Sequence, residues 1–117
     1  MATLTVQAGF VDSNVTMARN TSKQVTVAGN AFDYRVIDVT TGEFTFTIST
    51  EVGNAGYCYV RNTDATNYVQ LGFATGSYFI RLLAGQAGIF PIEPAQAALF
   101  LLADTATCEC EVYVHEV

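Results

Sequence analysis

Hydrophobic and polar residues alternate along most of the chain. In residues 43–50, Phe44, Phe46 and Ile48 alternate with threonine and serine, and residues 3–10 have a similar alternation that begins with Leu4. Successive side chains of a strand point to opposite faces of its sheet, so a period of two predicts β-strands. Both segments are therefore predicted to be strands with one buried face.

The same pattern predicts ten short strands separated by turns. Asp64 is expected in a hairpin loop, and residues 93–98, which include Pro94, are expected to form a turn or a short 3₁₀ piece. The expected strands are residues 3–10, 24–28, 33–39, 43–50, 57–62, 67–73, 77–83, 88–92, 98–103 and 107–117. The turn-forming pairs between them are Gly29-Asn30, Thr41-Gly42, Gly53-Asn54, Thr75-Gly76 and Ala84-Gly85.

Ten strands in 117 residues leave no room for the long crossover connections that parallel strands need. We therefore expect an all-β fold, an antiparallel β-sandwich of the jelly-roll type, formed by residues 1–117 as a single domain. A partly closed barrel is the alternative. The polar stretch of residues 12–24 is expected to be a loop, or an arm that joins the first strand to the rest.

The charge balance argues against several classes of partner. Eleven acidic and five basic residues give a net charge of −6, and the basic residues are scattered singly. Affinity for nucleic acid or for an anionic membrane needs clustered Lys and Arg, so we expect neither partner. No base follows Arg81, whereas five acidic residues do, and the C-terminal third is expected to present an acidic face.

The N-terminus lacks the basic and apolar regions of a signal peptide. No apolar run approaches the roughly 18–20 residues of a membrane span. We therefore expect no export signal and no membrane-spanning segment. An odd number of cysteines, three, suits free thiols in a reducing compartment.

The three cysteines and the only histidine are the first candidates for a metal site. Only one residue lies between Cys108 and Cys110 on an alternating strand, whereas two to four residues lie between the paired thiolates of zinc knuckles. Both thiols are therefore expected to point into an apolar layer with Cys58 and to behave as small hydrophobic groups. His115 falls on the opposite face of the strand, so no metal site is expected.

No arrangement of residues indicates an active site. No serine lies in a nucleophile-elbow sequence, and there is no phosphate-binding glycine loop and no acidic calcium loop. Glu109 and Glu111 share one strand face, where a solvated surface pair is the ordinary interpretation, whereas catalytic carboxylates face each other across a cleft. We therefore expect no catalytic residue, no cofactor and no enzyme.

Surface features point instead to binding. Five tyrosines in or near the strands favour either a sugar or peptide surface or simple strand formation. These tyrosines are Tyr57, Tyr59, Tyr68, Tyr78 and Tyr113. The segment 98–103 is apolar on both faces, so it must be covered twice, and another chain could be one of the covers. A monomer that covers this strand with its own loops is the alternative.

Three segments carry a resemblance to a known group of proteins. Residues 61–72 read Arg-Asn-Thr-Asp-Ala-Thr-Asn-Tyr-Val-Gln-Leu-Gly, and residues 78–90 read Tyr-Phe-Ile-Arg-Leu-Leu-Ala-Gly-Gln-Ala-Gly-Ile-Phe. Ala-Asp-Thr-Ala-Thr at residues 103–107 and a terminal strand follow. This half of the chain resembles small virion proteins of tailed bacteriophages. It departs from them at Gln86, where an acidic residue is expected, and in the Cys-Glu-Cys strand.

The resemblance implies a structural role in the virion, as a decoration or cement protein on the outer capsid. The implied partners are the major capsid protein and further copies of the chain, in a trimer or dimer. A polar arm near residues 12–24 could reach over a neighbour, so deletion of residues 2–24 is expected to abolish capsid attachment and leave oligomers intact. The alternatives are a head-tail joining or tail-tip subunit, a receptor- or glycan-binding subunit, and a cupin-type enzyme, which a single histidine disfavours.

Overall fold

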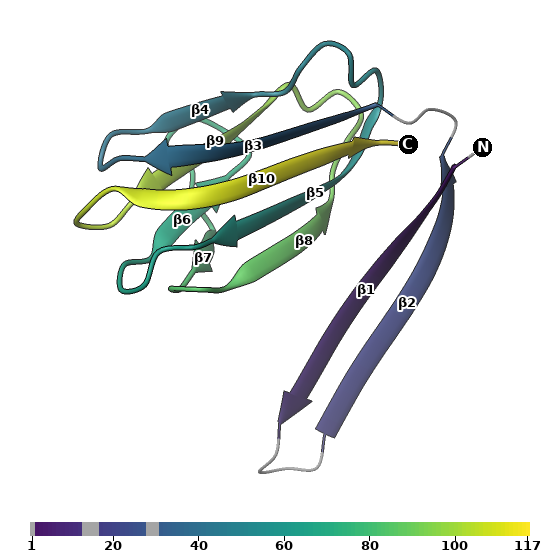
Figure 1. Cartoon of the computed structure of the whole chain (residues 1–117), viewed down its shortest axis with the longest axis horizontal. Helices are drawn as coiled ribbons and strands as arrows, with labels where there is room; N and C mark the ends of the chain where they lie inside the picture. The colour runs from purple at the N-terminus through teal and green to yellow at the C-terminus, as the bar shows by residue number, and fades with distance from the viewer. Residues whose placement is uncertain (1, 13–16, 28–30) are drawn as a thin grey trace.

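The computed structural model describes residues 2–12, 17–27 and 31–117. These residues form ten β-strands and no helix (Figure 1). The first two are β1 (Ala2–Asp12) and β2 (Met17–Val27). The others are β3 (Phe32–Val39), β4 (Phe44–Thr47), β5 (Ala55–Asn62), β6 (Val69–Gly72), β7 (Ile80–Leu82), β8 (Ala87–Pro91), β9 (Ala98–Ala103) and β10 (Cys108–Glu116).

Strands β3 to β10 make two four-stranded antiparallel sheets that face each other (Figure 1). One sheet has the order β3-β10-β5-β8 and the other has the order β4-β9-β6-β7. Each sheet places strands from the end of the chain between strands from its start, as in a jelly roll built from two Greek keys. The expected all-β antiparallel sandwich is confirmed, and two separate sheets replace the alternative of a partly closed barrel.

The core fills the space between the two sheets. Alternate residues of the inner strands β9 and β10 are fully buried, among them Leu99, Leu101, Val112 and Val114. They pack with one apolar cluster contributed by both sheets. On the outer face of β9, Phe100 and Leu102 are half-buried, so the chain itself supplies part of the second cover that residues 98–103 were expected to need.

Two polar side chains of the described residues are buried, those of Asp33 and Asn62, and that of Asn62 is buried completely. Asn62, at the end of β5, is 0% exposed, and its Nδ2 donates to the carbonyl oxygens of Asn67 and Leu82. Its Oδ1 accepts from the backbone N–H of Asp64. The Asp64 carboxylate in turn accepts from the N–H groups of Thr66 and Asn67, which closes the loop after β5. The prediction of a hairpin at this loop was wrong, because β5 and β6 belong to different sheets and the loop crosses from one sheet to the other.

The turn predictions are confirmed where the structure describes them. Gly76 and Gly85 have φ angles of 70° and 78°, a left-handed conformation that favours glycine. In residues 93–98, the N–H of Gln96 donates to the carbonyl of Glu93 in a single turn. The predicted turn at Gly29-Asn30 and residues 13–16 of the expected loop or arm lie outside the described residues.

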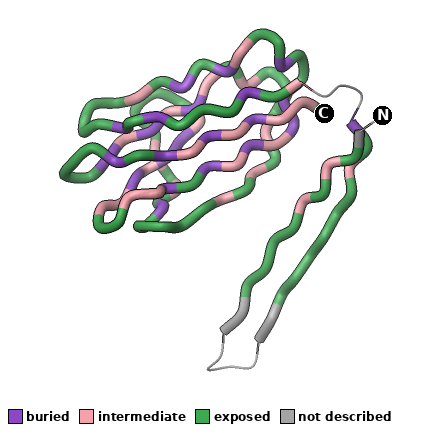
Figure 2. Tube along the Cα trace, viewed as in Figure 1, coloured by how far each residue is buried: buried purple, intermediate pink, exposed green. Residues whose placement is uncertain are grey.

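The N-terminal part of the chain differs from expectation. Strand β2 begins at Met17 rather than at residue 24, and β1 pairs only with β2 in a separate two-stranded sheet. Residues 17–24 are therefore strand and not loop. The expected buried face of residues 3–10 was wrong for Ala8 and Phe10, which are exposed because the hairpin projects from the sandwich (Figure 2). Every other strand starts and ends within three residues of its expected bounds.

Candidate functional site

The outer face of the sheet β3-β10-β5-β8 carries large apolar side chains. The register places Tyr34, Tyr113, Tyr59 and Ile89 in one row across the four strands. The next row contains Phe32, His115 and Tyr57. We call this surface the aromatic face; it comprises Phe32, Tyr34, Val36, Tyr57, Tyr59, Ile89, Tyr113 and His115.

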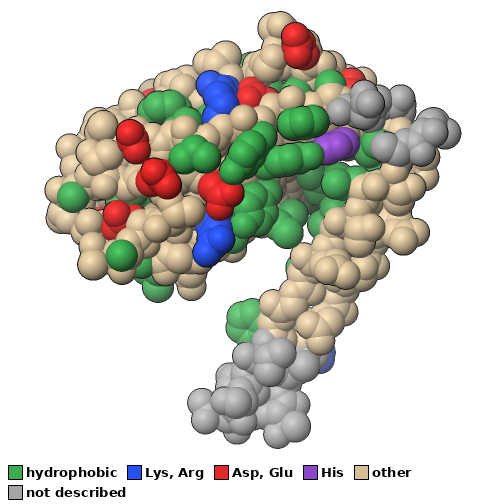
Figure 3. Space-filling model, viewed as in Figure 1, with side chains coloured by type: hydrophobic (Ala, Val, Ile, Leu, Met, Phe, Trp, Pro, Cys, Tyr) green, Lys and Arg blue, Asp and Glu red, His purple; other side chains and the backbone are tan. Residues whose placement is uncertain are grey.

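The rings of the aromatic face contact one another. Tyr113 is the centre: its ring stacks on that of Phe32, with centroids 5.5 Å apart, and on that of His115, with centroids 5.9 Å apart. The Tyr34 ring lies tilted against it at 6.1 Å. Phe32, Tyr34 and Val36 nevertheless stay 56%, 46% and 54% exposed. The rings are thus held in place while a large apolar area remains in contact with water (Figure 3).

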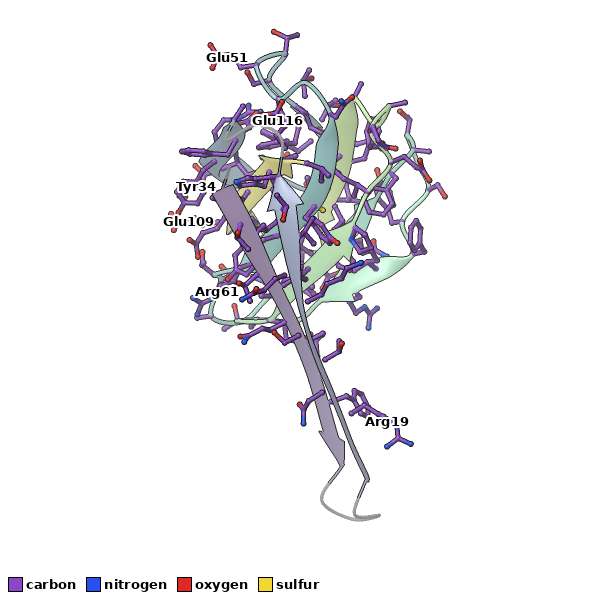
Figure 4. All side chains as sticks on the ribbon, turned by 90° about the vertical axis from the view of Figure 1, so that its right-hand side faces the viewer. Arg19, Tyr34, Glu51, Arg61, Glu109 and Glu116 are labelled. Carbon is purple, nitrogen blue, oxygen red and sulfur yellow. The ribbon has the colours of Figure 1, made fainter. Side chains whose placement is uncertain are left out.

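Charged groups border the aromatic face at one end. Glu111 pairs across the strands with Val36 and Arg61, and its Oε1 lies 3.9 Å from Nη1 of Arg61. Glu109 and Asp38 form the next cross-strand pair and are exposed. Tyr34, Arg61 and Glu109 lie on the same side of the molecule (Figure 4). The outer sheet surface therefore changes from aromatic near His115 to acidic near Glu109.

The β1-β2 hairpin, which we call the arm, has two unlike faces. Cross-strand partners share a face of an antiparallel pair, so the register assigns each side chain. Over residues 3–10 and 19–26, one face carries Thr, Gln, Ser, Gly and Asn; its pairs are Thr3 with Thr26, Thr5 with Gln24, Gln7 with Ser22, and Gly9 with Asn20. The other face is apolar and basic; its pairs are Leu4 with Val25, Val6 with Lys23, Ala8 with Thr21, and Phe10 with Arg19.

The base of the arm and the aromatic face enclose a cleft. Leu4, Thr5 and Val6 of β1 line it on one side. Tyr57, Cys58, Tyr59, Ile89, Tyr113 and His115 line it on the other. The volume is about 240 Å³. Farther out, the arm extends beyond the sandwich, and Arg19 lies on this distal part (Figure 4).

The structure distributes the charge unevenly between the two parts. Residues 2–27 contain Asp12, Arg19 and Lys23, for a net charge of +1. Residues 31–117 contain three bases and ten acids, for a net charge of −7. The arm is therefore slightly basic and the sandwich strongly acidic.

The cysteines lie where the alternation predicted. Cys58, Cys108 and Cys110 are free and buried in the core cluster, and His115 is on the opposite face of β10. Burial raises the pKa of Cys58 and of Cys110 to about 12. These thiols stay protonated at neutral pH and pack as apolar groups. Among the described residues, no group of three or more His, Cys, Asp or Glu side chains is placed to hold a metal ion.

The glutamates and tyrosines considered from the sequence do not form one site. The backbone carbonyl of Glu109 accepts a hydrogen bond from the hydroxyl of Thr63, 2.8 Å away. The five tyrosines divide: Tyr57, Tyr59 and Tyr113 meet on the aromatic face, whereas Tyr68 lies under the Arg81 guanidinium and Tyr78 donates to Glu43.

Sequence reasoning missed Phe32, Tyr34 and Val36 as surface residues. The segment 32–39 alternates, but its inner positions include a charged pair. Asp33 is buried and accepts from Arg35 and from the N–H of Ser49, and the Arg35 guanidinium lies 3.8 Å from the Phe46 ring centroid. The pair thus puts charge at the inner positions of an edge strand, where the Arg35 side chain stays 43% exposed, so polarity does not mark the outer side of β3. The sequence did contain a signal for this surface, because Phe32, Tyr34 and Val36 alternate along the strand and therefore share one face.

Comparisons with known proteins add no relative: no family model matches the chain, and neither curated proteins nor solved structures give a significant match. In the parts of the chain that the structure describes, no helix is long and apolar enough to cross a membrane.

Proposed function

We propose that this chain is a structural virion protein of the capsid-decoration type, which binds the outer surface of a phage capsid and stabilises it without catalysis. The observation that carries the proposal is the exposed aromatic face beside an arm that has an apolar face of its own. Contiguous exposed apolar surfaces mark contacts with other proteins. The resemblance of residues 61–72, 78–90 and 103–107 to small virion proteins specifies the kind of assembly.

The proposed partners are the major capsid protein and further copies of this chain, in a dimer or trimer. A capsid presents the same surface many times, so a small oligomer engages it at several points. Each contact then raises the effective concentration of the next, and weak contacts together give firm attachment. Only 14% of the residues are charged, so few charged side chains lose water when copies pack closely. The proposed location is the virion, after synthesis in the host cytoplasm.

Reconstitution tests the proposal. Expanded heads that lack this protein are mixed with the purified chain and sedimented, and the bound amount is measured as the concentration rises. We expect saturable binding and a higher temperature of DNA release from the decorated particles. Failure to co-sediment at any concentration, while the chain is folded, would contradict the proposal.

A matched pair of variants tests whether attachment depends on the aromatic face, either directly or through the oligomer. Val36→Ser removes an exposed side chain of the aromatic face, and Leu83→Ser removes one of similar exposure from the loop after β7. We expect Val36→Ser to lower the amount bound and Leu83→Ser to leave it unchanged. Equal loss in both variants would mean that attachment does not depend on the aromatic face.

A receptor- or glycan-binding subunit of the tail is the second candidate. It is favoured by the cleft, which three tyrosines line, because aromatic rings with polar tips suit sugar surfaces. Binding to a panel of host-surface glycans, followed by calorimetry, tests it. Specific binding that Tyr57→Ala abolishes and Tyr78→Ala retains would favour this candidate over decoration.

A further inference from the structure

We propose that the arm of one copy packs its apolar face on the aromatic face of a second copy, so that copies exchange arms in a closed homo-oligomer. The smallest such oligomer is a dimer in which both arms are exchanged, and its two contacts are identical. This contact is a property of the chain itself and holds whether or not the protein belongs to a virion.

The arm needs a surface to pack on. Its two strands pair only with each other, and a two-stranded hairpin alone in water is marginally stable. Phe10 is 68% exposed at the distal part of the apolar face. The opposite face of the arm consists of neutral polar residues that suit contact with water. The arm therefore has the pattern of a hairpin that packs its apolar face on a sheet and exposes its polar face to water.

The aromatic face fits this occupant, and a single copy already brings the two surfaces together. Leu4 and Val6 line the same cleft as Tyr57, Tyr59 and Tyr113. Their contact within one chain is confined to the base of the arm. Phe32, Tyr34 and Val36, on the side of β3, are not covered by it. A second arm supplies the same apolar side chains to this uncovered side.

Charge favours contact between the arm of one copy and the sandwich of another over contact between two arms or two sandwiches. The arm carries +1 and the sandwich −7, so an arm is attracted to the sandwich of another copy. Lys23 shares the apolar face of the arm with Val6, and Arg19 shares it with Phe10. On the sandwich, Glu109 and Asp38 stand at the acidic end of the same outer surface.

The apolar face of the arm and the outer face of β10 have matching lengths. From Leu4 to Phe10 is six residues of strand, and from His115 to Glu109 is six residues of β10, about 20 Å in each case. An arm laid antiparallel to β10 on the β3 side, with Leu4 at the row of Phe32, therefore brings Val6 to the row of Tyr34. Arg19, the cross-strand partner of Phe10, then comes to the acidic row of Glu109 and Asp38. Apolar groups meet aromatic rings, and opposite charges meet at the other end.

Oligomeric state as a function of concentration, measured by native mass spectrometry and sedimentation, tests the contact. Phe10→Ser and Phe79→Ser are matched, because both phenylalanines are 68% exposed but only Phe10 is on the arm. We expect a wild-type oligomer, no effect of Phe79→Ser, and weaker association of Phe10→Ser. Loss of the Phe10 side chain from one contact is expected to weaken association about tenfold. A dimer with two exchanged arms loses it from both contacts, so its dissociation constant is expected to rise about a hundredfold.

The deletion of residues 2–24 separates this inference from the sequence-based expectation. Arm exchange predicts that the deletion leaves monomers, whereas the sequence-based expectation was that oligomers remain intact. An oligomer that survives the deletion overturns arm exchange, and so does an association constant that Phe10→Ser leaves unchanged. A wild-type chain that is monomeric at every concentration overturns it as well.

A cross-link between two different variants gives an independent reading. Ala8→Cys places a thiol on the arm, and Val36→Cys places one on the aromatic face; the native thiols are buried. With a short bis-maleimide, only the mixture of the two variants is expected to form a cross-linked pair. No cross-link in the mixture, with a cross-link inside the double variant, would mean that each arm closes on its own sandwich. A high copy number on capsids together with monomers in solution would overturn arm exchange and leave the proposed function standing.

Discussion

The hydroxyl of Tyr34 on β3 donates a hydrogen bond to Oε2 of Glu111 on β10, 2.8 Å away. The same carboxylate faces Arg61 on β5 through its other oxygen. One acidic side chain thus ties together three neighbouring strands at the border between the aromatic and the acidic parts of the sheet surface. The hydrogen bond to Glu111 also raises the pKa of Tyr34, because ionisation of the hydroxyl removes the donated proton.

Glu111→Gln is expected to bring the pKa of Tyr34 down toward its ordinary value. A neutral amide does not repel the phenolate, and its oxygen accepts a weaker hydrogen bond from the hydroxyl than a carboxylate does. Titration of the tyrosine ring signals by NMR measures the change. Glu43→Gln is the control, because the Glu43 carboxylate raises the pKa of Tyr78 in the same way. A Tyr34 titration that Glu111→Gln leaves unchanged would show that this bond does not persist in solution.

Neighbouring leucines on β9 are expected to respond differently to truncation. Leu101 is fully buried between the sheets, whereas Leu102 is half-buried on the outer face. Leu101→Ala should lower the free energy of unfolding by about 3 kcal/mol, through lost burial and a cavity. Leu102→Ala should cost about 1 kcal/mol or less in the isolated chain. Denaturant unfolding measures both, and equal costs would contradict the assignment of the two faces.

Truncation of Asn62 is expected to destabilise the chain through its backbone partners. Asn62→Ala leaves the carbonyl groups of Asn67 and Leu82 without this donor. Leaving buried polar groups unpaired costs about 3 kcal/mol in total. Asn67→Ala removes a bond to Thr105 and a side-chain contact with the exposed Asp64 carboxylate, and should cost about 1 kcal/mol or less. If thermal and denaturant unfolding rank the variants the other way, the buried amide is not what organises this loop.

Stability is expected to fall in alkaline solution through Cys58 and Cys110. Their folded pKa of about 12 exceeds the ordinary value of 9.0. The folded chain therefore keeps two protons that the unfolded chain loses, so the contribution is full below about pH 9 and is lost between pH 9 and pH 12. The free energy of unfolding measured across this range should fall less steeply in the double variant Cys58→Ala, Cys110→Ala. The same slope in both proteins would contradict the burial of the thiols as the cause.

The sequence predicts much of this fold because the signals are local. Alternation located every strand of the sandwich, and glycines such as Gly76 and Gly85 marked turns that need a left-handed backbone. The inward direction of Cys108 and Cys110 followed from the parity of β10. These features depend on residues a few positions apart, so a single sequence is sufficient to find them.

The candidate site was less accessible because it depends on contacts between distant segments. The alternation of residues 3–10 predicts a buried face, but whether this chain or another copy buries it depends on how the hairpin is placed. The polar residues of β2 face water on both sides of a ribbon, so they read as loop. The inward pair of Asp33 and Arg35 concealed which side of β3 is the surface. The aromatic face becomes visible only when β3, β10, β5 and β8 are set side by side.

The central claim is that this chain decorates a phage capsid, and its abundance in purified particles tests that claim most directly. Particles of the phage that encodes it are purified on a density gradient, and quantitative mass spectrometry compares this chain with the major capsid protein. We predict a copy number of the same order as that of the major capsid protein. Absence from the particles, or the few copies that a tail or head-tail joining component would have, would contradict the account.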